Sequence, residues 1–136
     1  MIPLIVLMAL AADAPLTTIA RGTMSGQDTP RQVIVRTEAD WRELWKAHAP
    51  LQKLTAIDFS TRMALGVFLG SRPSAGFQVE IVAARQEDDT LVVEYVERRP
   101  GRDMMTAQVL TQPFHLVSLA RYDGPIRVVE RDAASR

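Results

Sequence analysis

MALGVFLGSRPSAGFQVEIVAA, residues 63–84, is the segment whose pattern says most about the fold. Residues 63–69 are continuously apolar, which is typical of a strand covered on both faces. Residues 70–76 are rich in Gly, Ser and Pro and predict a turn. Residues 77–84 then alternate between apolar and polar side chains, which predicts a strand with one covered face. We therefore expect a central β-hairpin on which the rest of the chain packs.

Further strands are predicted on both sides of this hairpin. Each of these segments is a short run rich in apolar, β-branched or aromatic residues, bounded in most cases by turn residues. The segments are 15–20, 32–36, 91–97, 104–110, 114–120 and 126–131. The pattern predicts a single small α+β domain, mostly β, with about seven antiparallel strands. A closed barrel and two packed sheets both fit it.

One helix is predicted, near residues 38–48. Thr37 can cap its start, and acidic residues follow in the first turn. Pro50 ends it, because the residue before a proline avoids the helical region. The apolar residues that recur at helical spacing and form one stripe are Trp41, Leu44 and Trp45.

The composition excludes several classes of function. The 136 residues suit one domain with a modest core. Sixteen basic residues balance sixteen acidic ones, so the basic excess typical of a nucleic-acid binder is missing and we expect no nucleic-acid partner. There is no cysteine, which excludes disulfides, thiolate chemistry and cysteine zinc sites.

The N-terminus, residues 1–14, has the pattern of an export signal. An apolar core is followed by Ala12-Asp13-Ala14, a small-x-small cleavage site. We expect a mature chain that begins near Pro15, a domain over residues 15–136, and a periplasmic or secreted location. The alternative is an apolar first strand or helix of the mature fold. No later stretch reaches the ~20 apolar residues of a membrane span.

No catalytic signature is present, and we expect no enzyme activity, metal or cofactor. A serine hydrolase would use Ser71 or Ser74 with His115, but the Gly-x-Ser-x-Gly elbow is absent. His48 and His115 share no metal-ligand spacing. His115 falls on the same side of a predicted strand as Val117, so we expect it to be packed and hydrogen-bonded.

Protein binding is the function that remains, and the turn at 70–76 is its best candidate. Pro73 stiffens this turn, and an arginine on a stiff loop can anchor a carboxylate or a protein surface. The alternative is that Arg72 pairs with an acidic side chain of its own chain. We expect the contact surface to combine residues 70–76 with residues 111–115. The predicted binding residues are Arg72, Pro73, Ser74, Phe77, Thr111, Pro113 and His115.

Taken in order, the motifs between residues 33 and 128 resemble the PrcB C-terminal domain family, named after a protease complex subunit. The motifs are Trp41-x-x-Leu-Trp45, Asp58-Phe-Ser60, 63–68, Gly70-x-Arg72-Pro73-x-x-Gly76-Phe77-x-Val79-x-Ile81, Pro100-Gly101 and Thr111-x-Pro113-x-His115-x-Val117.

The resemblance implies an exported, non-enzymatic domain that accompanies or stabilises a secreted protease. It brings no catalytic residues with it. A protease inhibitor that presents residues 71–75 as a substrate-like loop is the alternative, and a hydrolase that uses Ser74 and His115 is a second one. The oligomeric state stays open.

Overall fold

The computed structural model describes residues 13–132, so most of the predicted export signal lies outside the described residues. The elements are β1 (Thr17–Gly22), β2 (Arg31–Val35), α1 (Glu38–His48), β3 (Arg62–Phe68), β4 (Gln78–Glu87), β5 (Thr90–Arg98), β6 (Phe114–Ala120) and β7 (Ile126–Glu130). The helix bounds agree with the prediction. Within this range no helix combines the length and apolar character that crossing a membrane requires.

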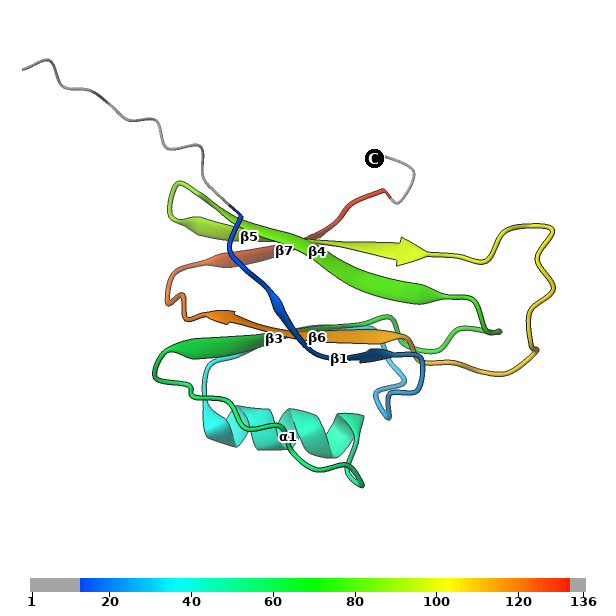
Figure 1. The fold of residues 1–136 in the computed structure, drawn as a ribbon, viewed down its shortest axis with the longest axis horizontal. Helices are drawn as coiled ribbons and strands as arrows, with labels where there is room; N and C mark the ends of the chain where they lie inside the picture. The colour runs from blue at the N-terminus through cyan, green and yellow to red at the C-terminus, as the bar shows by residue number, and fades with distance from the viewer. Residues whose placement is uncertain (1–12, 133–136) are drawn as a thin grey trace, which may run out of the picture.

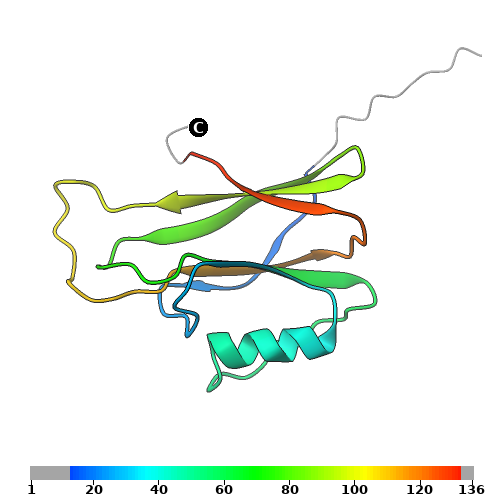
Figure 2. The same cartoon turned by 180° about the vertical axis from the view of Figure 1, so that it is seen from behind.

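The strands form two stacked sheets, and the helix makes a third layer (Figure 1). The first sheet has the strand order β1-β6-β3-β2 and lies between the helix and the second sheet, whose order is β4-β5-β7. Figure 2 shows the same three layers from behind. The prediction of a mostly-β α+β domain is confirmed, and of the two architectures left open, the chain adopts two packed sheets.

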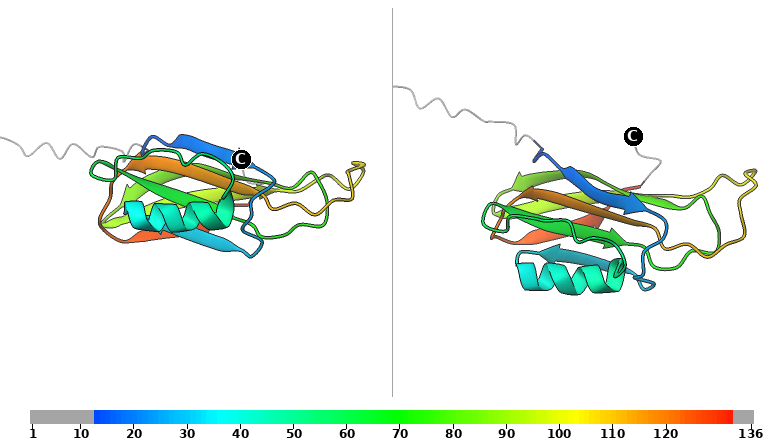
Figure 3. Two further views of the ribbon diagram at one scale, coloured as in Figure 1. Left: turned by 90° about the horizontal axis from the view of Figure 1, so that it is seen from below. Right: turned by 60° about the horizontal axis from the view of Figure 1, so that its bottom comes forward.

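The continuous apolar run of β3 follows from its central position. Met63, Leu65 and Val67 point into the core between the two sheets, whereas Ala64 and Phe68 point toward the helix. Both sets are buried, so the expected strand with two covered faces is confirmed. Figure 3 shows α1 lying across the first sheet.

The helix packs through the predicted stripe. Trp41, Leu44 and Trp45 are buried against the first sheet. The Nε1–H groups of the two tryptophans donate to the carbonyl oxygens of Thr55 and Gln52, at 2.8 and 2.9 Å. The connector after the helix is therefore tied to the helix by both indoles.

The same helix begins at the predicted cap. Thr37 has an extended backbone, and its Oγ1 accepts a hydrogen bond from the backbone N–H of Asp40. This bond satisfies one of the free donors of the first helical turn.

The predicted central hairpin is wrong. Residues 63–69 and 77–84 both supply strands, but β3 lies in the first sheet and β4 in the second. β3 pairs with β2 and β6, and β4 pairs with β5. The 70–76 segment therefore arches from one sheet to the other. A hairpin of 2–5 loop residues would have kept the chain in one sheet, and this connection is longer.

One strand pairing also differs from the antiparallel arrangement that the sequence predicted. β5 and β7 run parallel, from Leu91 opposite Ile126 to Tyr95 opposite Glu130. The turn after β6 carries the chain from the first sheet to the second, so β7 pairs with a strand that is not its neighbour in sequence. Apolar patterning sets the covered face of a strand, but not the direction of its neighbour.

The strand predicted at 104–110 is not formed. Residues 99–113 make a long irregular connection, with isolated bridges only at Thr111 and Gln112. The segment has strand-like composition, but no strand within residues 13–132 lies beside it to complete a ladder.

Candidate functional site

The 70–76 segment is fixed in shape by the two glycines that bound it. Gly70 and Gly76 have φ angles of 77° and 96°, a region that favours glycine. A Cβ added at Gly70 would lie 2.8 Å from Pro30, and one added at Gly76 would lie 2.8 Å from Pro100. The arch between the sheets therefore needs glycine at both ends.

Arg72 uses its guanidinium within its own chain. Its Nε and Nη2 donate to the two carboxylate oxygens of Glu97, at 2.9 and 3.1 Å, and its Nη1 donates to the carbonyl oxygens of Leu69 and Ser71. The Glu97 side chain is only 7% exposed. Hydrogen bonding to Glu97 raises the pKa of Arg72 above its ordinary value. The pair matches the alternative in which Arg72 bonds an acidic side chain, and it joins the arch to the second sheet.

The structure brings the two predicted binding segments together. Arg72 and Thr111 exchange backbone hydrogen bonds of 2.8 and 3.0 Å, and the Thr111 hydroxyl donates to the carbonyl oxygen of Ser74 at 3.0 Å. Ser74, Thr111 and Pro113 are buried. Of the predicted binding residues, Pro73 is exposed, whereas Arg72 and Phe77 are half-buried. Contact of these side chains with a partner stays a prediction.

His115 lies inside the molecule, between the two sheets, with 4% of its surface exposed. Its Nδ1 accepts the backbone N–H of Ile81 at 2.8 Å, so the ring proton sits on Nε2 and donates to the Thr18 hydroxyl at 2.9 Å. Burial, helped by the charge of Arg21, lowers the pKa of His115 to about 4. The expected packed, hydrogen-bonded histidine is confirmed, and its ring nitrogens link β6 to β1 and β4.

Ser74 and His115 do not form a nucleophile–base pair. The Ser74 hydroxyl donates to the carbonyl oxygen of Ala75, and both nitrogens of His115 are bonded elsewhere. An unactivated serine whose proton goes to a carbonyl is not a nucleophile.

A different serine–histidine pair was missed from the sequence. Ser25 Oγ lies 2.9 Å from Nδ1 of His48 and also accepts the backbone N–H of Gln27. Both residues of the pair are buried, and the His48 ring packs against Phe114 with ring centroids 4.3 Å apart. Burial lowers the pKa of His48.

The role of this pair is to fix the 23–30 loop to the end of α1, where the Gly26 N–H also bonds the His48 carbonyl oxygen. No spacing rule joins a loop serine to a histidine 23 residues later. The sequence therefore held no signal for the pair.

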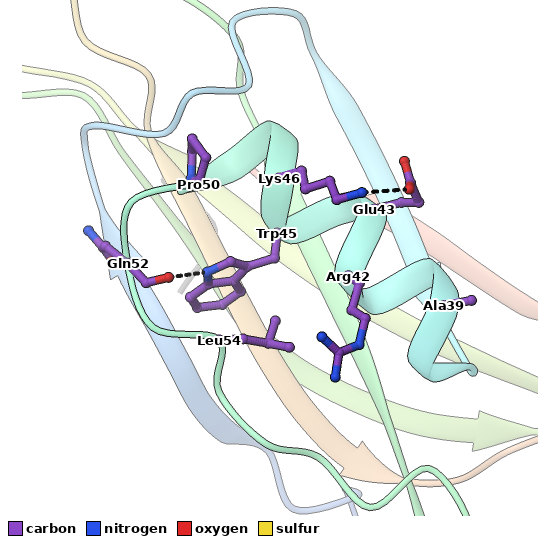
Figure 4. A pocket seen from close by; sticks show the side chains of 8 residues that line it. All are labelled: Ala39, Arg42, Glu43, Trp45, Lys46, Pro50, Gln52 and Leu54. Carbon is purple, nitrogen blue, oxygen red and sulfur yellow. Dashed lines mark hydrogen bonds and ion pairs between the residues drawn. The ribbon is translucent and has the colours of Figure 1, made fainter.

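A cleft of about 550 Å³ lies between α1 and the connector that follows it (Figure 4). Trp45 and Leu54 give it an apolar wall, and the indole N–H is already bonded to Gln52. Arg42 pairs with Glu38, and Lys46 pairs with Glu43 on the rim. The cleft offers a small apolar surface and no group poised for chemistry.

Metal ligands do not converge anywhere in the part of the chain that the structure describes. The acidic tip of the β4–β5 hairpin is instead hydrogen-bonded locally, for example from Gln86 Nε2 to the carbonyl oxygen of Asp88.

The exposed apolar side chains form the most distinctive surface. Among residues 13–132, six large hydrophobic side chains are exposed, and Met105 is 99% exposed. The six are Met24, Leu51, Met104, Met105, Val109 and Leu110. They lie on the 23–30 loop, the turn after α1 and the 99–113 connection, which are toward the same end of the molecule but in different layers of it (Figure 1). We call this surface the apolar end.

The loops of the apolar end are bonded to one another. Met24 and Gln112 form a parallel bridge, and Leu69 donates its N–H to the Pro113 carbonyl oxygen at 3.0 Å. The apolar side chains are thus presented on a backbone that is fixed at its base. Sequence patterns did not predict this surface, because the apolar residues of 104–110 had been assigned to a strand.

The comparison with protein families gives one match. The family model described as PrcB C-terminal matches residues 63–120, from the second residue of β3 to the last of β6. The resemblance is thereby confirmed over this range, which includes the arch, the 99–113 connection and His115 but not the tryptophans of α1. No curated protein and no solved structure matches the chain.

Proposed function

Residues 63–120 belong to the PrcB C-terminal family, and on that premise we propose that the chain is an exported, non-enzymatic accessory domain that binds and stabilises a secreted protease. The family association supports a role beside a protease complex. The observation that carries the proposal to this chain is the apolar end. Four of the six exposed large apolar side chains lie on the 99–113 connection, and a concentration of exposed apolar side chains marks a contact surface.

The composition of the apolar end suits contact with a protein. Met24, Met104 and Met105 are unbranched and polarizable, so they adapt to the shape of a partner surface. Pro73 on the neighbouring arch adds a rigid contact, held in place by the Arg72–Thr111 bridge. A surface that is ordered before binding loses less conformational entropy when the complex forms.

An inhibitory loop is supported less well. A substrate-like inhibitor lays the extended backbone of its loop against the protease. Here the N–H and carbonyl oxygen of Arg72 are both bonded to Thr111, and Ser74 is buried. The accessory role requires only exposed side chains, so we prefer it.

Export is part of the same proposal and rests on the sequence of residues 1–14. The backbone N–H of Ala14 donates to the carbonyl oxygen of Ala84 at 2.6 Å. A mature chain that starts at Pro15 would lack this bond. N-terminal sequencing of periplasmic or secreted material decides the matter: a chain that still begins with Met1 would contradict export by cleavage.

The binding role is tested by co-expression with the secreted protease encoded nearest to this chain in its genome. The protease is expected to accumulate with the chain and to degrade itself without it. The double substitution Met24→Gln/Leu51→Gln should weaken the complex about tenfold or more, since that factor corresponds to ~1.4 kcal/mol. Arg127→Gln, a substitution on the far face of the second sheet, is the matched control.

Two results would contradict the proposal. One is a protease whose yield and lifetime are the same with and without the chain. The other is a fall in proteolytic activity that is proportional to added chain, which would assign the inhibitory role instead.

A further inference from the structure

The segment 104–110, MMTAQVL, has one edge bonded to its own chain and one edge with nothing on it. The Ala107 carbonyl oxygen accepts from the Ala75 N–H at 3.0 Å, and Thr111 exchanges hydrogen bonds with Arg72. The Gln112 N–H points to the opposite edge, where it donates to the carbonyl oxygen of Thr23 at 2.7 Å. Ala107 and Thr111 thus direct their backbone toward the arch, and Gln112 directs its backbone away from it. Because successive residues of an extended chain alternate in this way, an extended 104–110 segment would direct its even-numbered residues away from the arch.

The away-facing edge is open at Thr106, Gln108 and Leu110. In the described part of the chain, no group donates to or accepts from the backbone of these three residues. Gln108 and Leu110 are exposed, and Thr106 is half-buried. Three N–H and three carbonyl groups thus have no partner within the described chain, in the 99–113 connection that projects from the sandwich in Figure 1.

The sheet edges proper are protected, in contrast. The outer edge of β4 is covered by two groups that remain in a chain beginning at Pro15: Arg21 Nε on the Val79 carbonyl, and the ring of His115 on the Ile81 N–H. β2 starts with Arg31, and β7 carries Arg127 and Glu130. The pairing of β1 shifts register after Thr18. Charges, coverings and bulges of this kind keep sheet edges from pairing. Residues 104–110 have none of them.

The sequence of this segment is complementary to itself. About Ala107, the order of side chains is apolar, apolar, polar, Ala, polar, apolar, apolar. We propose that two copies of the chain pair through residues 104–110 as antiparallel strands related by a two-fold axis at Ala107. Met104 then lies opposite Leu110 of the second copy, Met105 opposite Val109, and Thr106 opposite Gln108.

The hydrogen bonding of the single copy selects this register. Thr106 and Gln108 face each other across the axis and exchange N–H···O bonds, because their backbones are the ones left open. Ala107 faces its own copy across the axis as a pair without hydrogen bonds, since its carbonyl is held by Ala75. A two-fold contact closes on itself and gives a dimer, not a fibre.

Pairing requires a local change at Gln108, and Met104 can pair only through its carbonyl oxygen, because its N–H already donates to the Gly101 carbonyl oxygen at 3.0 Å. The Val109 N–H donates to the Ala107 carbonyl oxygen at 3.0 Å, a tight turn that is common where strands begin. Straightening Gln108 releases that bond, and the bonds to the second copy replace it.

Single cysteines test the register, because the chain has none of its own. In the dimer, the two copies of residue 107 lie opposite each other, within the Cα distance that a disulfide needs. Ala107→Cys should therefore oxidise to a disulfide-linked dimer. Met105→Cys is the control: its side chain is 99% exposed, but its two copies lie four residues apart along the ribbon, ~13 Å. The double variant Met105→Cys/Val109→Cys should cross-link again.

Sedimentation of the unmodified chain is the second measurement. It should give a monomer–dimer equilibrium, and Gln108→Pro should shift it to monomer, because proline removes an edge N–H that has no partner within the chain. Leu51→Gln, an equally exposed apolar position away from the edge, should leave the equilibrium unchanged.

The proposal fails if the chain sediments as a monomer at every concentration. It also fails if Met105→Cys cross-links as fast as Ala107→Cys, which would show unspecific association of apolar surfaces. Binding of the monomer to phosphatidylcholine vesicles would assign the segment to a lipid surface and overturn it equally. The protease test above substitutes Met24 and Leu51, which lie outside residues 104–110, so either proposal can fail while the other stands.

Discussion

The two ends of the sandwich differ in what their side chains contact. At the end opposite the apolar one, arginine side chains close the structure: Arg36 donates to the carbonyl oxygens of Tyr122 and Gly124 at 3.0 Å each. The Tyr122 hydroxyl donates to the Asp89 carbonyl oxygen, which joins the hairpin tip of the second sheet. We call these contacts the polar end. At the apolar end, the bonds lie at the base of the loops and the tips carry exposed side chains.

This difference separates stability from contact. Side chains of the polar end satisfy backbone carbonyls of their own chain, so their loss should be felt in folding. Side chains at the tip of the apolar end touch little of their own chain, so their loss should be felt in association.

Lowering the pH should reduce the free energy of unfolding more than any substitution described below. The group responsible, His115, lies nearer the apolar end. His115 is the second residue of β6 from that end, and its neutral ring accepts the Ile81 N–H. Its pKa of about 4 lies below the ordinary value of 6.5, so the unfolded chain takes up the proton first as pH falls. Stability is full above pH 6.5 and declines until about pH 4. The loss is on the order of 3 kcal/mol, since each pKa unit corresponds to ~1.4 kcal/mol.

Urea unfolding at several pH values measures this loss. Arg21, which is cationic, and Glu80 are the charged groups that face His115, and Glu80 partly offsets the effect of Arg21. His115→Asn keeps an acceptor near the Ile81 N–H but does not titrate, so its stability should fall less over this range. An identical pH profile for both proteins would contradict the role given to His115.

Substitution of Arg72 should have the second-largest effect on the free energy of unfolding. Arg72→Ala leaves Glu97 buried without its partner and should lower the free energy of unfolding by about 2–3 kcal/mol, less than for a fully buried pair because Arg72 is partly exposed. Arg99→Ala is the control, since Arg99 is 74% exposed and lies 3.9 Å from the same carboxylate. Equal effects in chemical denaturation would mean that the Arg72–Glu97 pair does not hold the arch.

Arg36 measures the contribution of the polar end. Arg36→Ala removes two hydrogen bonds to carbonyl groups and should cost about 1–2 kcal/mol. The thermal midpoint should fall with no change in the dimer equilibrium. A variant with the same thermal midpoint as the parent protein would show that the polar end does not contribute to stability in the way proposed.

Met105 should give the smallest change in stability. Met105→Gln alters a side chain that is 99% exposed, so the free energy of unfolding should stay within about 0.5 kcal/mol. Association should weaken in the same protein. A marked loss of stability would show that the tip of the apolar end packs on its own domain.

The sequence predicted elements better than their arrangement. The α1 bounds, its tryptophan stripe and the two-faced burial of β3 follow from apolar periodicity, which depends only on local spacing. Whether the chain turns back or crosses over after β3 depends on where β4 finds its partner. That partner is β5, and no local pattern in residues 70–76 predicts this pairing.

The candidate site shows the same limit. The sequence placed residues 70–76 and 111–115 on one surface, and the Arg72–Thr111 bridge brings them together. It could not show that Arg72 is bound to Glu97, because the two lie 25 residues apart in different elements. The strand predicted from the composition of 104–110 is wrong, because no strand of the described domain lies beside this segment to pair with it.

Amide hydrogen exchange at Thr106, Gln108 and Leu110, followed as a function of protein concentration, tests most directly whether the apolar end is an edge completed by a second chain. We expect fast exchange in dilute solution and protection in concentrated solution. The Gln112 amide, bonded to Thr23, should be protected throughout. Fast exchange of the three amides at every concentration would mean that no second chain pairs with this edge.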